Sequence, residues 1–276
     1  GVEVVVITGY NGGSYQWKNV DGISVHYLPV SYDNRFGFYR RIFSFFQYVV
    51  KSVWIARQHR DAALCYAIST PLTTGLAALI IRHYYGIRYL FEVGDLWPDA
   101  PVAMGFVRNG LMKRILYSME RAIYRGADSI VALSEPIGDV IALKISGKPV
   151  HVLPNMADTD FFNPEEKLDM LEERFRVKEK FVVSYIGALG VANGLRYFID
   201  CAAASERAGL PCRFILCGDG AMAEELKRYA EKLDVRNLTF VRFQNRDGVR
   251  EVMNVTDVNF VSYLPVKILE TGSPNK

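Results

Sequence analysis

The sequence predicts an α/β protein of two units, each built around a parallel sheet, and three observations predict it. Apolar strand candidates alternate with helical segments along the whole chain, and this alternation requires crossover connections between parallel strands. The chain has 276 residues, more than the roughly 150 that one domain typically needs. Hydrophobic residues make up 50% of it, so each unit has enough apolar material for a core.

The expected strands are short apolar runs bounded by turn residues. In chain order they span 2–8, 23–29, 63–68, 87–93, 129–133, 150–153, 181–187, 212–217, 238–243 and 258–262, and helices are expected at 39–59, 165–176, 195–208 and 222–233. A strand ends at Leu153-Pro154-Asn155 and a turn-rich connector follows. We therefore expect domains at 1–155 and 156–276. The first strand begins almost without a lead-in and the last residues form a turn that leads nowhere, so a piece of a longer protein is expected.

The expected helix 39–59 is apolar nearly all round. Its narrow polar stripe comprises Arg40, Ser44, Gln47, Lys51 and Gln58. Such a helix is either buried in a core or pressed into a membrane interface. We favour core packing, and the basic residues in and near the helix keep contact with anionic lipid headgroups open as the alternative.

Charge and residue patterns exclude several classes of protein. The net charge is only +3, well below the basic excess of a nucleic-acid-binding protein. The four cysteines are scattered and the four histidines are isolated, so neither a disulfide framework nor a protein-bound metal is expected. No uncharged apolar stretch reaches the ~20 residues of a membrane-spanning helix, and no G-x-S-x-G motif supports a serine hydrolase.

Two glycine turns follow strands of the second unit. The first runs from Gly187 to Gly194 and leads into a helix, and the second is Gly218-Asp219-Gly220. A strand that passes through glycines into a helix presents unpaired backbone N–H groups and the positive end of the helix dipole, which suit a phosphate. Ligands of an open parallel sheet bind outside the carboxyl ends of its strands. Two such turns at one edge predict a nucleotide site, with plain tight turns as the alternative.

In the first unit, Asp95 and Asp99 follow the expected strand 87–93. Asp95 stands where that strand delivers a side chain to the ligand edge of the sheet, so we favour a functional role for it. Aspartate is also a favoured N-cap residue. For Asp99 we expect capping of the helix or turn that follows.

Several blocks of the sequence occur in a characteristic order. They are ERAIYRGADSIVALS at 120–134, VLPNMADTDFF at 152–162, and the turns at Gly187 and Gly218. Together they resemble the group 1, family 4-like retaining glycosyltransferases of the GT-B fold. Within that family, Asp95-Leu96-Trp97-Pro98 and the final segment 272–276 resemble a bacterial branch that adds sugars, often N-acetylated ones, to surface polysaccharides.

The resemblance implies two Rossmann-like domains with a cleft between them, the first for a polysaccharide or lipid-linked acceptor and the second for a nucleotide-sugar donor, UDP-linked in our expectation. No metal and no organic cofactor is implied, because helix N-termini and basic side chains neutralise the diphosphate. The diphosphate would lie against Gly187–Gly190, and the base and ribose near Gly218, Gly220 and Arg242. The implied location is the cytoplasm, with peripheral contact with the inner membrane surface as a further expectation.

The sequence departs from the family pattern at several positions. Ala188 and Asn193 stand where many members carry an arginine and a lysine, although Asn193 is still expected at the nucleotide sugar. Lys276 is the expected replacement for the missing positive charge, with Asn275 beside it in the donor site. Glu270 is expected to be the first of the family's two acidic residues, or one residue out of register. The family's first strand and glycine-rich loop are missing, so we expect this piece by itself not to turn over.

Two other functions stay open. A NAD-dependent sugar dehydrogenase or epimerase is also doubly wound, but its first strand should lead into G-x-G-x-x-G. Here the first strand leads into Gly9-Tyr10-Asn11-Gly12-Gly13. A non-catalytic GT-B protein that binds a nucleotide or a glycan is favoured by the missing cations and the incomplete acidic pair.

Overall fold

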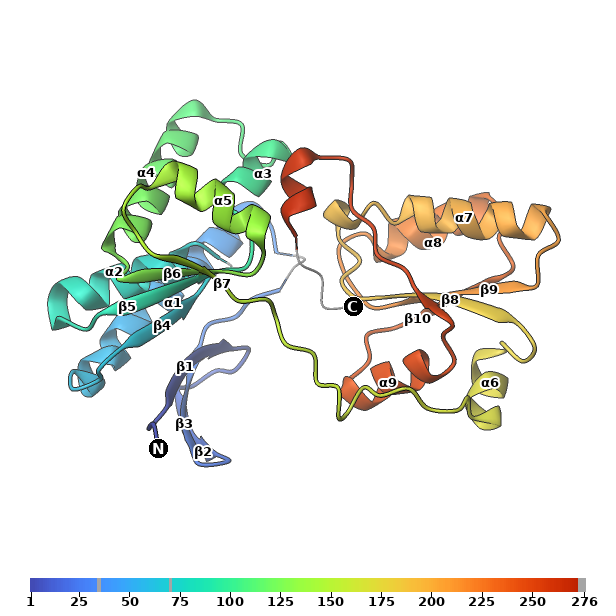
Figure 1. Cartoon of the computed structure of the whole chain (residues 1–276), viewed down its shortest axis with the longest axis horizontal. Coiled ribbons are helices and arrows are strands. Elements are labelled where there is room, and N and C mark those ends of the chain that lie inside the picture. The colour runs from blue at the N-terminus through green and yellow to red at the C-terminus, as the bar shows by residue number, and fades with distance from the viewer. Residues whose placement is uncertain (34–35, 70, 273–276) are drawn as a thin grey trace. The chain divides into compact units, whose positions relative to one another are not determined.

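The computed structural model in Figure 1 describes residues 1–33, 36–69 and 71–272. The chain divides into two compact units. Among the described residues, the first unit consists of Gly1–Asn155 and Glu270–Gly272, and the second consists of Met156–Leu269. Each unit has its own sheets and its own buried clusters of apolar side chains.

The amino-terminal sheet of the first unit has the strand order β1-β3-β2. Its strands are β1 (Val5–Tyr10), β2 (Gln16–Val20) and β3 (Ile23–Pro29). β1 pairs with β3 in parallel, whereas β2 and β3 form an antiparallel hairpin that turns at Asp21 and Gly22, with φ of 51° and 85°. Positive φ at both positions is typical of a type I′ turn. β2 was not predicted, because the sequence of β2 is polar, mostly exposed and contains no apolar run. The expectation of parallel strands is wrong for this antiparallel hairpin.

The second sheet of the first unit is parallel throughout, in the order β4-β5-β6-β7. Its strands are β4 (Cys65–Ile68), β5 (Tyr89–Val93), β6 (Ser129–Ala132) and β7 (Val150–Val152). The unit also contains α1 (Phe38–Ala56), the 3₁₀ helix η1 (Arg57–His59), α2 (Thr73–Tyr85), α3 (Asp99–Ala103), α4 (Gly110–Gly126) and α5 (Glu135–Lys144). Tyr89, Phe91 and Ile130 of the central strands are fully buried, as parallel strands covered on both faces require.

The second unit has one parallel sheet, in the order β10-β9-β8-β11. Its strands are β8 (Phe181–Ile186), β9 (Cys212–Cys217), β10 (Leu238–Val241) and β11 (Val258–Asn259). Its helices are α6 (Asp169–Phe175), η2 (Val191–Asn193), α7 (Arg196–Arg207), α8 (Ala223–Lys232), α9 (Arg246–Asn254) and most of η3 (Lys267–Thr271). α7 and α8 cover one face of this sheet, and α6 and α9 cover the other (Figure 1).

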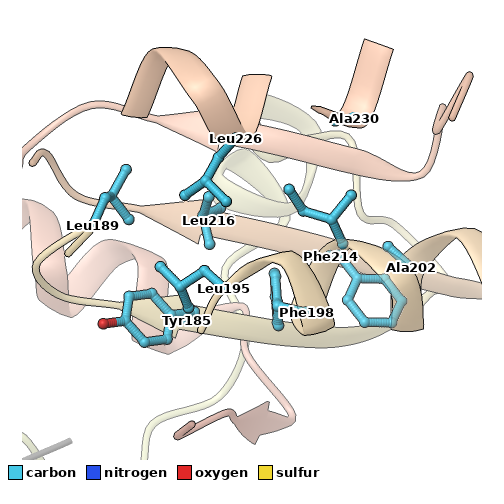
Figure 2. Close-up of a cluster of buried hydrophobic side chains, with 10 residues drawn as sticks. Tyr185, Leu189, Leu195, Phe198, Ala202, Phe214, Leu216, Leu226 and Ala230 are labelled. Atoms are coloured by element: carbon cyan, nitrogen blue, oxygen red, sulfur yellow. The ribbon is translucent and has the colours of Figure 1, made fainter. Parts of the chain in front are cut away.

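The larger core of the second unit lies between the sheet and the helices α7 and α8 (Figure 2). Phe198 of α7 packs edge-on against Phe214 of β9, with ring centroids 5.3 Å apart, and Leu226 of α8 is buried beside them. On the opposite face, Phe175 of α6 and Val252 of α9 are buried against β8 and β9. The strands that end at the candidate site are therefore held from both sides.

Core packing explains only one face of α1. Ile55 is buried, and so are Ser44 and Ser52, whereas Phe43 and Trp54 are exposed. The interpretation of α1 as a core helix is therefore correct for one face and wrong for the other, and Ser44 of the expected polar stripe lies inside. In the described part of the chain, no helix combines the length and the apolar character that crossing a membrane requires.

A pair of histidines joins β3 to η1. His26 is 3% exposed; its Nε2 lies 3.0 Å from Nε2 of His59, and its Nδ1 lies 2.7 Å from the hydroxyl of Tyr15. Burial holds the pKa of His26 below its usual 6.5, and the neighbouring His59 lowers it further. The folded protein therefore resists protonation at a position where the unfolded chain accepts it readily.

We expect the free energy of unfolding to fall as the pH drops below about 6.5, because the unfolded chain then binds a proton that folded His26 does not. At higher pH the imidazole is neutral in both states and adds no pH dependence. Urea unfolding at about pH 7.5 and about pH 5.5 measures the loss. The loss should shrink in His26→Gln and persist in His83→Gln, whose ring is exposed. Equal losses in all three proteins would contradict this role of His26.

Candidate functional site

Two loops meet at the carboxyl edge of the sheet in the second unit. Gly187, directly after β8, donates its N–H to the carbonyl of Cys217 at 2.9 Å, and Gly218, directly after β9, donates to the carbonyl of Val241 at 2.9 Å. A Cβ on Gly218 would lie 1.9 Å from the Gly187 carbonyl oxygen, and Gly218 has φ of +148°. Close approach of the two backbones therefore requires glycine at 218.

A second backbone contact joins the same loops. The N–H of Leu189 donates to the carbonyl of Asp219 at 2.9 Å, and the carbonyl of Leu189 accepts from the N–H of Met222 at 3.0 Å. A Cβ on Gly220 would lie 2.5 Å from that Leu189 carbonyl oxygen. The two glycine turns thus lie side by side. Packing between these loops is sufficient to require glycine at 218 and 220, whether or not a ligand binds.

The loop between β8 and α7 presents a row of backbone donors. Within the described residues, the N–H groups of Ala188, Gly190, Val191 and Ala192 have no hydrogen-bond acceptor. α7 begins at Arg196 without a side-chain cap. The N–H of Tyr197 donates to the carbonyl of Gly194 at 3.1 Å, and the N–H of Arg196 has no acceptor among the described residues. Adjacent backbone donors beside the positive end of a helix can bind an anion.

Side chains of the second unit brace this loop through its carbonyl groups. The hydroxyl of Tyr185 donates to the carbonyl of Ala188 at 2.8 Å, and the hydroxyl of Ser262 donates to the carbonyl of Asn193 at 2.5 Å. Burial raises the pKa of Tyr185, so its phenol stays a hydrogen-bond donor at neutral pH. These bonds hold the loop in place and leave its N–H groups available.

The loop carries no cation of its own at Ala188 or Asn193. Arg242, directly after β10, is exposed at the same edge of the sheet. Two further residues predicted for the donor site, Asn275 and Lys276, lie outside the described residues. Within the described chain, the glycine loops therefore provide backbone dipoles, and Arg242 provides a full positive charge near the strand ends.

The two predicted catalytic carboxylates that the structure describes are both exposed. Asp95 lies two residues beyond the carboxyl end of β5. The N-cap of α3 is Pro98, so Asp95 does not cap that helix. Glu270 lies in η3 and is grouped with the first unit.

Asp99 belongs to an ionic cluster rather than to a helix cap. It lies in the first turn of α3 after Pro98, and the Tyr117 hydroxyl donates to it at 3.2 Å. Lys144 pairs both with Asp99 and, at 2.6 Å, with Glu120, which is only 3% exposed. Burial raises the pKa of Glu120, and the Lys144 ammonium opposes that rise. The expected capping role of Asp99 is wrong because its partners come from α4 and α5, which are distant in sequence.

The connector that follows the first unit is fastened to α9. Arg246 pairs with Asp158, and its guanidinium lies 4.1 Å from the ring centroid of Phe161. Arg250 lies 5.3 Å from the same centroid. Two cation–π contacts and an ion pair thus attach the segment 158–161 to α9 within the second unit.

Comparison with known proteins decides the family. A model described as "Glycosyl transferase 4-like domain" matches residues 1–156, and one described as "Glycosyl transferases group 1" matches residues 167–270. The chain belongs to the glycosyl transferase 4-like family. The resemblance drawn from the sequence blocks is confirmed. The first match includes Asp95, and the second includes both glycine loops.

Two curated relatives are themselves sugar transferases by name. The chain is 25% identical over 158 residues to an alpha-D-kanosaminyltransferase of Streptomyces kanamyceticus, across 55% of this chain and 40% of that protein. It is 22% identical over 183 residues to the colanic acid biosynthesis glycosyl transferase WcaI of Escherichia coli (strain K12), across 64% of this chain and 44% of that protein. The chain thus spans less than half the length of these relatives.

Solved structures share the fold. Sucrose-phosphate synthase from Thermosynechococcus elongatus is 12% identical with a TM-score of 0.72, covering 99% of this chain and 70% of that one. HepE of Anabaena, solved with UDP-glucose, is 17% identical with a TM-score of 0.61, covering 80% of this chain and 58% of that one. At these identities the likeness shows the fold alone, and it confirms the α/β class with parallel sheets and the GT-B type.

Two features of this glycosyl transferase 4-like chain could not be predicted from its residue types: the open backbone N–H groups and the Glu120–Lys144 pair. The open N–H groups of Val191 and Ala192 belong to the backbone, so the side chains carry no sign of them. The flanking Gly190 and Gly194 were the available signal, because they bound the short helix η2. The Glu120–Lys144 pair had no comparable signal in the sequence.

Proposed function

We propose that the full-length protein is a retaining transferase that moves a sugar from a nucleotide-sugar donor to a polysaccharide or lipid-linked acceptor. Family membership supports the transferase reaction. The likeness to HepE, solved with UDP-glucose, supports a UDP-linked donor, and the segment Asp95-Leu96-Trp97-Pro98 favours an N-acetylated sugar. The observation that carries the proposal is the row of open N–H groups between β8 and α7.

In this proposal the donor diphosphate binds to the N–H groups of the segment 188–192 and to the start of α7. The leaving diphosphate gains negative charge as the sugar departs, so donors fixed in advance stabilise the transition state more than the ground state. The base and ribose lie near Gly218, Gly220 and Arg242. Asn193 contacts the nucleotide sugar.

The charged groups of the reaction are part of the same proposal. Lys276 supplies the positive charge that Ala188 and Asn193 lack, with Asn275 beside it at the donor. Glu270 is the first acidic residue of the donor-sugar site. Asp95 orients the acceptor hydroxyl or assists loss of its proton. A lipid-linked acceptor requires the enzyme to work at a membrane surface, and this location is proposed with it.

The backbone cradle has a direct test in Gly190→Val. Gly190 has φ of −102° and ψ of 163°, and an added Cβ would contact only Asn193 Oδ1, at 3.3 Å. The fold should therefore accept valine, while the side chain covers the open N–H groups. We expect UDP affinity measured by calorimetry to fall by at least about 10-fold, because each lost charge-assisted hydrogen bond contributes roughly 1.5–3 kcal/mol.

Gly187→Val is a poorer test than its sequence position suggests, since φ of +153° at Gly187 is strained for valine. Gly13→Val is the matched control, because an added Cβ there meets nothing within 4 Å and the residue lies in the first unit. Unchanged UDP affinity in a folded Gly190→Val protein would remove the diphosphate from this loop.

A non-catalytic nucleotide-binding protein is the second candidate, and the absence of cations at Ala188 and Asn193 favours it. Both candidates predict UDP binding. Only the transferase predicts a glycosylated product from the full-length protein.

A further inference from the structure

Helix α1 presents five large apolar side chains to solvent. These are Tyr39, Phe43, Phe46, Val50 and Trp54, each between 51% and 86% exposed. At about 100° per residue, the five fall within an arc of roughly 80° and form one row along the helix, named the α1 stripe. Single exposed apolar residues are common on protein surfaces, whereas a contiguous row marks an interaction site.

The opposite face of α1 buries small polar residues. Ser44 and Ser52 are both buried, and their hydroxyls donate to the carbonyls of Arg40 at 3.0 Å and Tyr48 at 2.7 Å within the helix. Ile55 packs in the same interior, against Leu28 of β3. Burying a phenylalanine stabilises a fold far more than burying a serine. α1 buries Val49 and Ile55 together with the two serines, while the aromatic side chains of the α1 stripe stay outside. This arrangement indicates that the α1 stripe is exposed for a partner.

The segment that carries the α1 stripe contains charges of one sign only. No acidic residue occurs from Phe36 to Arg60, while this segment contains the basic residues Arg40, Arg41, Lys51, Arg57 and Arg60. The guanidinium of Arg57 lies 6.0 Å from the ring centroid of Trp54, and that of Arg40 lies 3.8 Å from the ring centroid of Phe36. Cations beside a row of aromatic side chains match a partner that is apolar inside and negatively charged at its rim.

We propose that α1 lies in the interface of a membrane containing anionic lipids, with the α1 stripe among the acyl chains and the arginines at the lipid phosphates. Apolar and aromatic residues on one face with basic residues beside them are typical of helices that lie in the membrane plane. A second copy of this chain fits poorly, because a symmetric contact would bring two basic rims together without an acidic residue between them. The inference concerns the first unit and holds independently of the donor site.

Vesicle binding tests the α1 stripe. The full-length protein should bind phosphatidylglycerol vesicles, and Phe43→Ser/Phe46→Ser/Val50→Ser should weaken that binding by at least about 100-fold, since three apolar side chains no longer enter the acyl region. The control is Leu111→Ser/Ile115→Ser/Leu143→Ser, which removes comparably exposed apolar side chains of α4 and α5 and should bind like the wild type. Thermal unfolding confirms that each variant is folded.

Two further readouts separate insertion from simple charge attraction. In a Trp17→Phe/Trp97→Phe background, Trp54 is the one remaining tryptophan of residues 1–276. The part of the emission that is lost when Trp54→Phe is added should shift to the blue on vesicle binding. Arg40→Gln/Arg41→Gln/Arg57→Gln should lower affinity for the anionic vesicles by about 100-fold at low salt, at about 1 kcal/mol per charge.

Equal vesicle binding by the wild type and the folded Phe43/Phe46/Val50 variant would overturn the proposal, and so would Trp54 emission that does not shift. Sedimentation adds one outcome. If the wild type self-associates and the stripe variant does not, the α1 stripe is a contact between copies and the membrane assignment is wrong.

Discussion

Lys144→Met is expected to lower the free energy of unfolding by about 3 kcal/mol, because it leaves the buried carboxylate of Glu120 without its counter-charge. Lys144 donates to Glu120 at 2.6 Å and also pairs with Asp99, so one substitution unpairs two carboxylates. Glu120 lies in α4 and Lys144 ends α5, so the pair fixes one helix relative to the other. Urea unfolding of the purified protein measures the change.

Two comparisons make the Lys144 result specific. Adding Glu120→Gln to Lys144→Met should restore part of the lost stability, because the remaining buried side chain is then neutral. Lys180→Met, at an exposed lysine, should change stability by less than about 0.5 kcal/mol. The defect of Lys144→Met should also be smaller at pH 5 than at pH 8, since burial raises the pKa of Glu120 and protonation removes the unpaired charge. An equal defect at both pH values would contradict the ionic explanation.

Asp95→Asn is expected to reduce turnover of the full-length enzyme by about 100-fold, the scale of losing a group that assists proton transfer. Asparagine keeps the shape of the side chain and removes its charge. UDP affinity should stay close to that of the wild type, because Asp95 belongs to the first unit and the proposed donor site belongs to the second. Turnover assays and calorimetry on the same preparation measure both properties.

Asp99→Asn provides the contrast four residues away. Asp99 is held by Tyr117 and Lys144, so its loss should reduce stability with a smaller effect on turnover at temperatures where the variant is folded. Near wild-type turnover in Asp95→Asn would remove the proposed role at the acceptor.

The sheets of both units were largely predictable because parallel strands are buried on both faces and read as apolar runs. β5 and β9 show this most clearly, with Tyr89, Phe91, Ile215 and Leu216 fully buried. β2 was not predicted because this exposed edge strand contains no apolar run. The turn at Asp21-Gly22 is the local sequence signal of the hairpin.

The positions of the glycine loops were predictable from the sequence, whereas the structural reason for their glycines was not. The glycine turns at 187 and 218 predicted a nucleotide site or plain tight turns, and the structure shows that the two loops also pack closely on each other. Partners distant in sequence, such as Asp99 with Lys144, depend on how helices pack and leave no local pattern. The sequence also did not predict which face of α1 is buried, because apolar residues occur on nearly all sides of this helix.

The most direct test of the central claim is product detection with the full-length protein, a panel of nucleotide sugars and glycan or lipid-linked acceptors. We predict that a UDP-linked sugar yields a glycosylated product with the anomeric configuration of the donor, and that Gly190→Val abolishes this product without unfolding the protein. UDP binding without transfer to any acceptor would contradict the transferase assignment and favour a nucleotide-binding protein. Transfer that is unaffected by Gly190→Val would place the donor elsewhere.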